Sequence, residues 1–183
     1  MSIVSSTFSN TIELSPAYLG VDPGASGGMT LLQGSTIATY RVDAYQDDAA
    51  LWYAISGIAH SRYKYGFYCC LEQVTGYMGE SKGSEKPGSR MFNFGVSYGK
   101  LQAFLTAAGI PYILVSPNVW QRALGIKTKG KEESKSRYKA RLKAIAQARY
   151  PRHPLTLDTA DSLLIALYCK QVHEKEQANA ANP

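Results

Sequence analysis

The chain has 183 residues, of which 45% are hydrophobic and 19% charged, and it carries a net charge of +6. The length suits a single domain, because a chain of about 150 residues already buries roughly two-thirds of its unfolded surface on folding. No stretch approaches the roughly 18 apolar residues that a membrane span needs, so no membrane partner is expected. The three cysteines, Cys69, Cys70 and Cys169, contain no CxxC pair, which argues against a zinc site and a disulfide framework.

The N-terminal residues 1–16 are rich in Ser, Thr and Asn, and we expect a flexible extension there. This segment lacks the positively charged region and the long apolar run of a signal peptide. A cytoplasmic location is therefore expected, with an organelle left open.

The first half of the chain predicts four strands and one helix. Leu51, Ile55 and Ile58 recur at helical spacing, which predicts a helix over residues 48–60. Asp22 directly follows the first strand, and Glu72 lies near the end of the fourth. The four strands are expected at residues 18–21, 29–32, 36–42 and 67–74.

The second half is expected to be mainly helical. A Gly- and Ser-rich loop is predicted at 75–90 and a Lys- and Gly-rich loop at 125–133. A strand is expected at 110–115, and helices are expected at 91–108, 117–124, 134–149 and 157–173, followed by a polar tail at 174–183. Three strands followed by alternation predict an α/β fold in one domain (17–173), with a mixed five-stranded sheet and helices on both faces.

The basic charge is concentrated in residues 127–143. This segment holds eight basic and two acidic residues, so its surplus of six equals the net charge of the whole chain. A basic patch favours an anionic partner, and we expect it to contact DNA phosphates, although a solvated helix face is the alternative. The DNA-contacting residues predicted here, with the neighbouring Arg122, are Lys127, Lys129, Lys131, Lys135, Arg137, Lys139, Arg141 and Lys143. On the helix we expect Tyr138, Leu142 and Ile145 to face inward and Lys135, Lys139 and Lys143 outward.

Four carboxylates are the candidate catalytic residues. Asp22 and Glu72 lie at strand ends, and Asp158 and Asp161 are three residues apart, so they share one face of a helix. Clustered carboxylates repel one another unless a cation is present, and oxygen ligands suit Mg²⁺ or Mn²⁺. The alternatives are a turn residue for Asp22, helix caps for the Asp pair and a solvent-facing Glu72.

Three runs of sequence, LGVDPGASGG, CCLEQV and LDTADSLLIALY, resemble the RuvC family of Holliday-junction resolvases. The stretch YGKLQAFLTAAGIPYILVSPNVWQRALGI looks closer to the phage and chloroplast branch of that family. The resemblance implies an RNase H-like fold, a homodimer, and symmetric nicking of the two strands of a four-way DNA junction. Asp22, Glu72, Asp158 and Asp161 match the metal-binding acidic residues, although some members have His where Asp158 stands.

The resemblance also implies a two-metal mechanism. Asp22 would bridge two Mg²⁺ or Mn²⁺ ions, Glu72 and Asp161 would hold one each, and Asp158 would complete the site. One ion would activate the attacking water and the other would stabilise the leaving 3′-oxygen. The resemblance implies products with a 5′-phosphate and a 3′-hydroxyl.

The long loop at 75–90 is a second place where DNA contacts are expected. Thr75 stands where bacterial relatives carry an aromatic residue that wedges into the junction, and Tyr77 follows it. Tyr77 is therefore a candidate for base stacking, and Lys82, Lys86 and Arg90 are candidates for backbone contacts.

The helix predicted at 91–108 is a candidate dimer interface. It carries more apolar surface than one helix face needs, from Met91, Phe92, Phe94 and Phe104. Core packing is the alternative.

Several other functions remain open. GVDPGASGG also resembles the phosphate-binding hairpin of actin-like kinases, but those need two such domains. Gly99-Lys100 lacks the rest of a Walker A motif, so no nucleotide cofactor is expected. A flap or RNA–DNA hybrid nuclease, and a catalytically inactive branched-DNA-binding protein, are the remaining alternatives.

Overall fold

The computed structural model describes residues 15–24, 27–42, 47–62, 66–74 and 87–181. A five-stranded sheet with the order β3-β2-β1-β4-β5 forms its centre. β2 is antiparallel to both β1 and β3, whereas β1, β4 and β5 run parallel, so the expected mixed sheet is confirmed. The strands are β1 (Ala17–Val21), β2 (Gly28–Gln33), β3 (Thr36–Arg41), β4 (Phe67–Glu72) and β5 (Tyr112–Val115).

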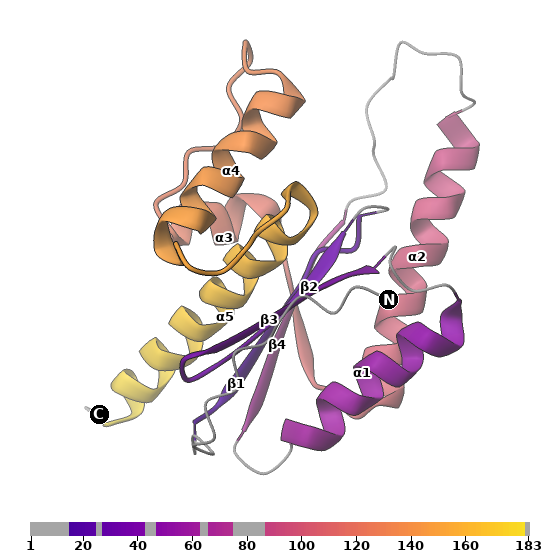
Figure 1. Ribbon diagram of the computed structural model, residues 1–183, viewed down its shortest axis with the longest axis vertical. Coiled ribbons are helices and arrows are strands. Elements are labelled where there is room, and N and C mark those ends of the chain that lie inside the picture. The colour runs from indigo at the N-terminus through magenta and orange to yellow at the C-terminus, as the bar shows by residue number, and fades with distance from the viewer. Residues whose placement is uncertain (1–14, 25–26, 43–46, 63–65, 75–86, 182–183) are drawn as a thin grey trace.

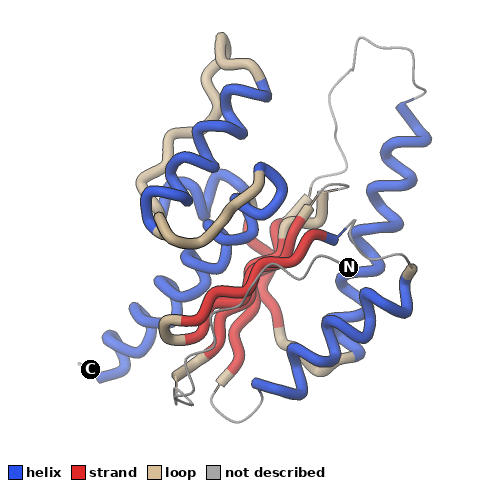
Figure 2. Tube along the Cα trace, viewed as in Figure 1, coloured by secondary structure: helices blue, strands red, loops and turns tan. Residues whose placement is uncertain are grey.

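Helices cover both faces of the sheet, as the sequence predicts (Figures 1 and 2). α1 and α2 lie on one face, and α3, α4 and α5 lie on the other. Each face has its own apolar core, and the adjacent Cys69 and Cys70 point into opposite cores. No helix in the described ranges is long and apolar enough to cross a membrane. The helices are α1 (Asp48–Arg62), α2 (Pro87–Ala107), α3 (Pro117–Ala123), α4 (Lys135–Arg149) and α5 (Leu157–Ala181).

Two helix boundaries differ from the sequence prediction by more than two residues. α2 begins at Pro87 rather than at 91, because proline is favoured at the first position of a helix, where its missing N–H is not needed. α5 continues eight residues beyond 173, to Ala181, because its exposed Glu, Lys, Gln and Ala residues are good helix formers. The loop residues 75–86 and the extension 1–14 lie outside the described residues.

α5 packs unusually close to the sheet, where it crosses β1 and β2. A Cβ atom added to Gly20 would lie 2.2 Å from the backbone N of Ala166 and 2.2 Å from the backbone O of Ser162. The Ser162 hydroxyl also bonds that of Thr30, with 2.8 Å between the two oxygens, in the buried interface. Because Gly20 has no side chain, β1 can approach the helix that carries Asp158 and Asp161 this closely.

We expect Gly20→Ala to lower the free energy of unfolding by about 1–3 kcal/mol or more, because the methyl group meets rigid backbone atoms. Gly57→Ala is the matched control, since an added Cβ meets nothing within 4 Å at that position in α1. This control should be neutral or stabilising by up to about 1 kcal/mol. Urea unfolding of the two variants measures both effects, and a Gly20→Ala variant as stable as wild type would contradict the packing argument.

Candidate metal centre

Asp22 and Glu72 are brought to one edge of the sheet by the pairing of β1 with β4. The two strands are parallel neighbours, and their register places Val21 opposite Leu71. Asp22 follows Val21, and Glu72 follows Leu71, so the two carboxylates leave adjacent strands at the same level. Side chains at the carboxyl ends of parallel strands share one edge of the sheet, which is where α/β proteins commonly bind ligands.

Asp22 is buried and oriented by the turn that follows it. Its Oδ1 accepts a hydrogen bond from the backbone N–H of Gly24 at 3.0 Å, and its own N–H donates to the carbonyl of Gly28 at 2.9 Å. Asp22 therefore does stabilise the turn, as the alternative interpretation predicts, but only through Oδ1. Its second oxygen, Oδ2, lies 3.9 Å from Nζ of Lys139.

Asp158 and Asp161 approach the same place from the first turns of α5. Neither serves as the helix cap, because Thr156 Oγ1 accepts from the backbone N–H groups of Asp158 and Thr159, at 3.2 Å each. Asp158 Oδ2 lies 3.5 Å from Nε of Arg41, at the end of β3. Asp161 is buried, and within the part of the chain that the structure describes its Oδ1 has no hydrogen-bond partner.

Lys139 is turned inward, toward these carboxylates. Its ammonium group pairs with Asp161 Oδ2 and approaches Asp22, so the expectation that Lys139 faces outward with Lys135 and Lys143 is wrong. The reason is electrostatic, since two buried carboxylates lie within reach of a long side chain on the adjacent helix. Burial lowers the pKa of Lys139, but the carboxylates of Asp161 and Asp22 outweigh it, and the net pKa is raised.

Glu72 is held by an aromatic residue that is not among the site residues predicted from the sequence. The indole Nε1–H of Trp120 donates to Glu72 Oε1 at 2.9 Å. The V-S-P-N-V-W turn predicts a helix start but gives no indication of what the indole contacts. Only the packing of α3 against the sheet places this donor beside Glu72.

The carboxylates affect one another electrostatically. The pKa of Asp22 is raised to about 6, mainly because the side chain is buried. The charge of Lys139 opposes this shift, whereas the charges of Asp161 and Asp158 add to it. Burial also raises the pKa of Glu72 to about 8, and the charge of Asp22 contributes in the same direction. Ionising all of these groups together is costly unless positive charge is supplied.

The donor chemistry fits a divalent cation. As they stand, no three Asp, Glu, His or Cys side chains among the described residues are grouped closely enough to hold a metal ion, and Lys139 supplies the positive charge instead. However, Asp161 has an unpartnered buried oxygen, and the donors are carboxylates, which Mg²⁺ and Mn²⁺ prefer. Asp22, Glu72, Asp158 and Asp161 are therefore the residues that could bind such ions if their side chains moved closer together.

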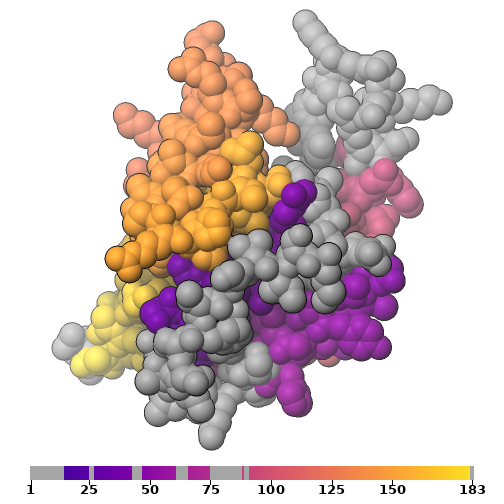
Figure 3. Space-filling view, in the orientation of Figure 1, coloured from indigo at the N-terminus to yellow at the C-terminus, as the bar shows by residue number. Residues whose placement is uncertain are grey.

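Six of the nine predicted DNA-contacting residues whose side chains the structure describes are exposed. In Figure 3 the orange residues of α4 and of the segment before it form the upper left of the molecule. Lys143 is half-buried, Tyr77, Lys82 and Lys86 lie outside the described residues, and so does the side chain of Arg90. The exposed members of the set are Arg122, Lys127, Lys129, Lys131, Lys135 and Arg137.

Arg141 forms hydrogen bonds within the basic segment. Its guanidinium donates to both carboxylate oxygens of Glu133 at 2.9 Å and to the carbonyls of Lys127 and Thr128 at 3.0 and 3.4 Å. These contacts tie the 125–133 loop to α4. Arg141 thus orders the loop that presents the exposed lysines, and its predicted contact with DNA stays a prediction.

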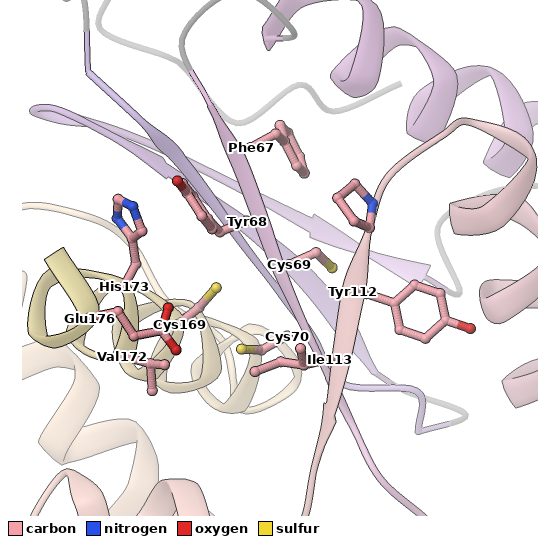
Figure 4. Close-up of a pocket in the computed structure, with 11 residues that line it drawn as sticks. Phe67, Tyr68, Cys69, Cys70, Tyr112, Ile113, Cys169, Val172, His173 and Glu176 are labelled. Atoms are coloured by element: carbon pink, nitrogen blue, oxygen red, sulfur yellow. The ribbon is translucent and has the colours of Figure 1, made fainter. Parts of the chain in front are cut away.

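The structure also has an apolar pocket of about 310 Å³ between β4, β5 and the second half of α5 (Figure 4). His173 lines it, but its Nδ1 is engaged with the hydroxyl of Tyr18 at 3.0 Å and its Nε2 with Gln177 at 3.3 Å. The pocket lies along α5 about three turns from Asp161, at 3.6 residues a turn. The carboxylate edge, rather than this pocket, therefore has the groups for hydrolytic chemistry.

Comparison with known proteins identifies the fold. No protein-family model matches the chain, and no curated protein matches it either. A structure of Thermus thermophilus RuvC in complex with a Holliday junction substrate is similar, with a TM-score of 0.55 and 14% identity over 87% of this chain and 96% of that chain. A second Thermus thermophilus RuvC structure gives 0.51 and 13% over the same shares. The chain therefore has the RNase H-like fold of RuvC, and the closer likeness to the phage and chloroplast branch stays a prediction.

The raised pKa values predict how stability depends on pH in the metal-free protein. Carboxyl groups in the unfolded chain have pKa values near 4. In the folded protein the pKa of Asp22 is about 6 and that of Glu72 is about 8, so both groups stay protonated to higher pH. The folded state therefore binds more protons in this window, and the free energy of unfolding should fall as pH rises from about 4 through about 8.

Glu72→Gln should remove the part of this decline that lies between about pH 6 and 8. Urea unfolding in EDTA at a series of pH values measures it, and the exposed Glu132→Gln is the control for loss of a negative charge. Identical pH profiles for Glu72→Gln and wild type would contradict the electrostatic coupling.

Proposed function

We propose that this protein is a metal-dependent endonuclease that resolves four-way (Holliday) DNA junctions by paired symmetric nicks. The main support is the carboxylate edge, where Asp22, Glu72 and Asp161 come from two strand ends and a helix. Burial and the neighbouring carboxylates raise the pKa values of Asp22 and Glu72 there. Such an arrangement is unfavourable in a protein without a cation, but it suits a site that binds one.

In this proposal Asp22, Glu72, Asp158 and Asp161 hold two Mg²⁺ or Mn²⁺ ions. When bound, these ions supply an activated water and neutralise charge on the phosphodiester. The chain's own contribution is orientation, since Gly24 N–H fixes one oxygen of Asp22 and Trp120 fixes one oxygen of Glu72. Lys139 holds a positive charge against Asp161 and offsets part of the negative charge of the buried cluster.

The choice of branched DNA as substrate rests on the surface and on the structural neighbour. The exposed lysines before and on α4 form a positively charged flank that can contact phosphates, and the similar RuvC structure contains a Holliday junction substrate. That substrate belongs to the neighbour, so for this chain it is part of the proposal.

Paired nicks require two active sites, which a homodimer supplies. α2 offers an apolar surface for it, because Phe92 is 70% exposed and Met91 and Val96 are also exposed. Phe104, by contrast, is partly buried and packs against the core beside Trp52, so the exposed large apolar residues lie in the first half of α2. Exposed apolar residues grouped on one helix commonly mark a protein interface.

A nicking assay tests the activity directly. Wild type should cut a labelled four-way junction at symmetric positions with Mg²⁺ or Mn²⁺, and it should cut linear duplex, flap and RNA–DNA hybrid far less. Asp22→Asn should bind the junction but lose activity by more than the roughly 10–100-fold that an outer-shell change costs at metal sites. Preferential cutting of flap or hybrid would assign a different RNase H-like nuclease, and binding without cutting would assign an inactive junction-binding protein.

The basic flank predicts a steep salt dependence of junction binding. The logarithm of the affinity in EDTA should fall linearly with the logarithm of salt concentration, and the slope should decrease by about 0.9 for each lost phosphate contact. Lys131→Ala and Lys135→Ala should each reduce the slope, whereas Lys175→Ala, an exposed lysine near the far end of α5, should not. An affinity that is flat across salt, or an equal effect of all three variants, would contradict the assignment of this flank.

A further inference from the structure

Trp120 makes a polar contact that its packing alone does not require. Trp120 is 1% exposed and belongs to the core cluster beneath α4 and α5, so its packing alone does not decide which group accepts its N–H. Yet its single N–H is directed at Oε1 of Glu72, 2.9 Å away, rather than at a backbone carbonyl. A buried indole N–H needs an acceptor, and here that acceptor is one of the candidate metal-binding carboxylates.

We infer that Trp120 is a positioning residue of the metal centre, whose indole N–H holds Oε1 of Glu72 and leaves the other oxygen for the cation. The inference rests on the proposed function, and it deepens that function by assigning a role to a residue outside the four carboxylates. Carboxylates that bind metals are in general hydrogen-bonded by a second layer of residues, which sets their orientation.

The strand pairing of β4 with β5 places the start of α3, which carries Trp120, close to Glu72. β5 pairs with β4 so that Val115 lies opposite Glu72, and the N–H of Gln73 donates to the carbonyl of Val115 at 2.7 Å. α3 begins directly after β5, where the carbonyl of Ser116 accepts from the N–H of Trp120 at 3.3 Å. The donor and the acceptor are thus connected through one strand pair and one helical turn, with little freedom between them.

Lys139 and Trp120, two of the polar groups that contact the carboxylate cluster, differ in kind. Lys139 brings a full positive charge to Asp161, so it competes with any cation for the same oxygens. Trp120 is a neutral donor, so it can orient Glu72 while the carboxylate keeps its charge for the metal. The indole contact can therefore persist when the metal is bound, which is the requirement for a positioning residue.

The two tryptophans of the chain, Trp52 and Trp120, provide a matched pair for the test. Trp120→Phe keeps an aromatic ring in the core but removes the N–H, while Trp52→Phe makes the same change on α1, where the ring packs against Phe104. We expect Mg²⁺ and Mn²⁺ binding, measured by calorimetry without DNA, to weaken about 10–100-fold in Trp120→Phe and to be unchanged in Trp52→Phe. Junction nicking by Trp120→Phe should return to the wild-type rate at saturating Mg²⁺, which a general loss of structure would not allow.

A second measurement leaves Trp120 intact. The spectrum of Trp52→Phe lacks one of the two indole N–H resonances, which assigns both of them. In the wild-type protein the Trp120 resonance should shift on addition of Mg²⁺, and it should also differ in the Glu72→Gln variant. The Trp52 resonance should not change in either case. Unchanged metal affinity in Trp120→Phe, or a Trp120 resonance that is insensitive to both Mg²⁺ and Glu72→Gln, would overturn the inference while leaving the proposed function in place. A wild-type protein that binds neither Mg²⁺ nor Mn²⁺ would overturn the proposed function, and the inference with it.

Discussion

The constraint on which the rest of the structure depends is the repulsion among carboxylates at one edge of the sheet. Asp22 and Asp161 are buried there, and burial, together with the charge of Asp22, raises the pKa of Glu72 to about 8. A fold can keep such groups together only if it also supplies positive charge and directed hydrogen bonds. Lys139, the Gly24 N–H and Trp120 meet this need in the protein as described.

Close backbone packing makes the arrangement possible. α5 must approach β1 and β2 closely enough for its first turns to reach the carboxyl ends of the strands, and the lack of a side chain at Gly20 permits that approach. The buried hydroxyl pair of Thr30 and Ser162 fixes the helix along its axis. The apolar cores on both faces then hold the sheet rigid, so that small shifts of the helix are resisted.

The basic side chains of residues 127–143 lie in two different environments, which the composition of the segment does not distinguish. Lys139 and Arg141 are turned inward, one to the carboxylates and the other to the 125–133 loop. Lys143 is half-buried, and the exposed lysines of the segment are Lys127, Lys129, Lys131 and Lys135. The positively charged surface is therefore smaller than the charge count suggests, but it is also better ordered. An ordered loop would lose less conformational entropy on binding a partner than a disordered one.

The sequence by itself determined the order of the elements, the mixed sheet and the positions of Asp22 and Glu72 at strand ends. These features follow from local periodicity, because a strand or helix repeats its pattern over a few residues and ends at recognisable turn residues. It could not place Lys139 or Trp120, whose partners lie 22 and 48 residues away along the chain. Only the tertiary structure decided these contacts, because the direction of a long side chain on a helix depends on the neighbouring element against which that helix packs.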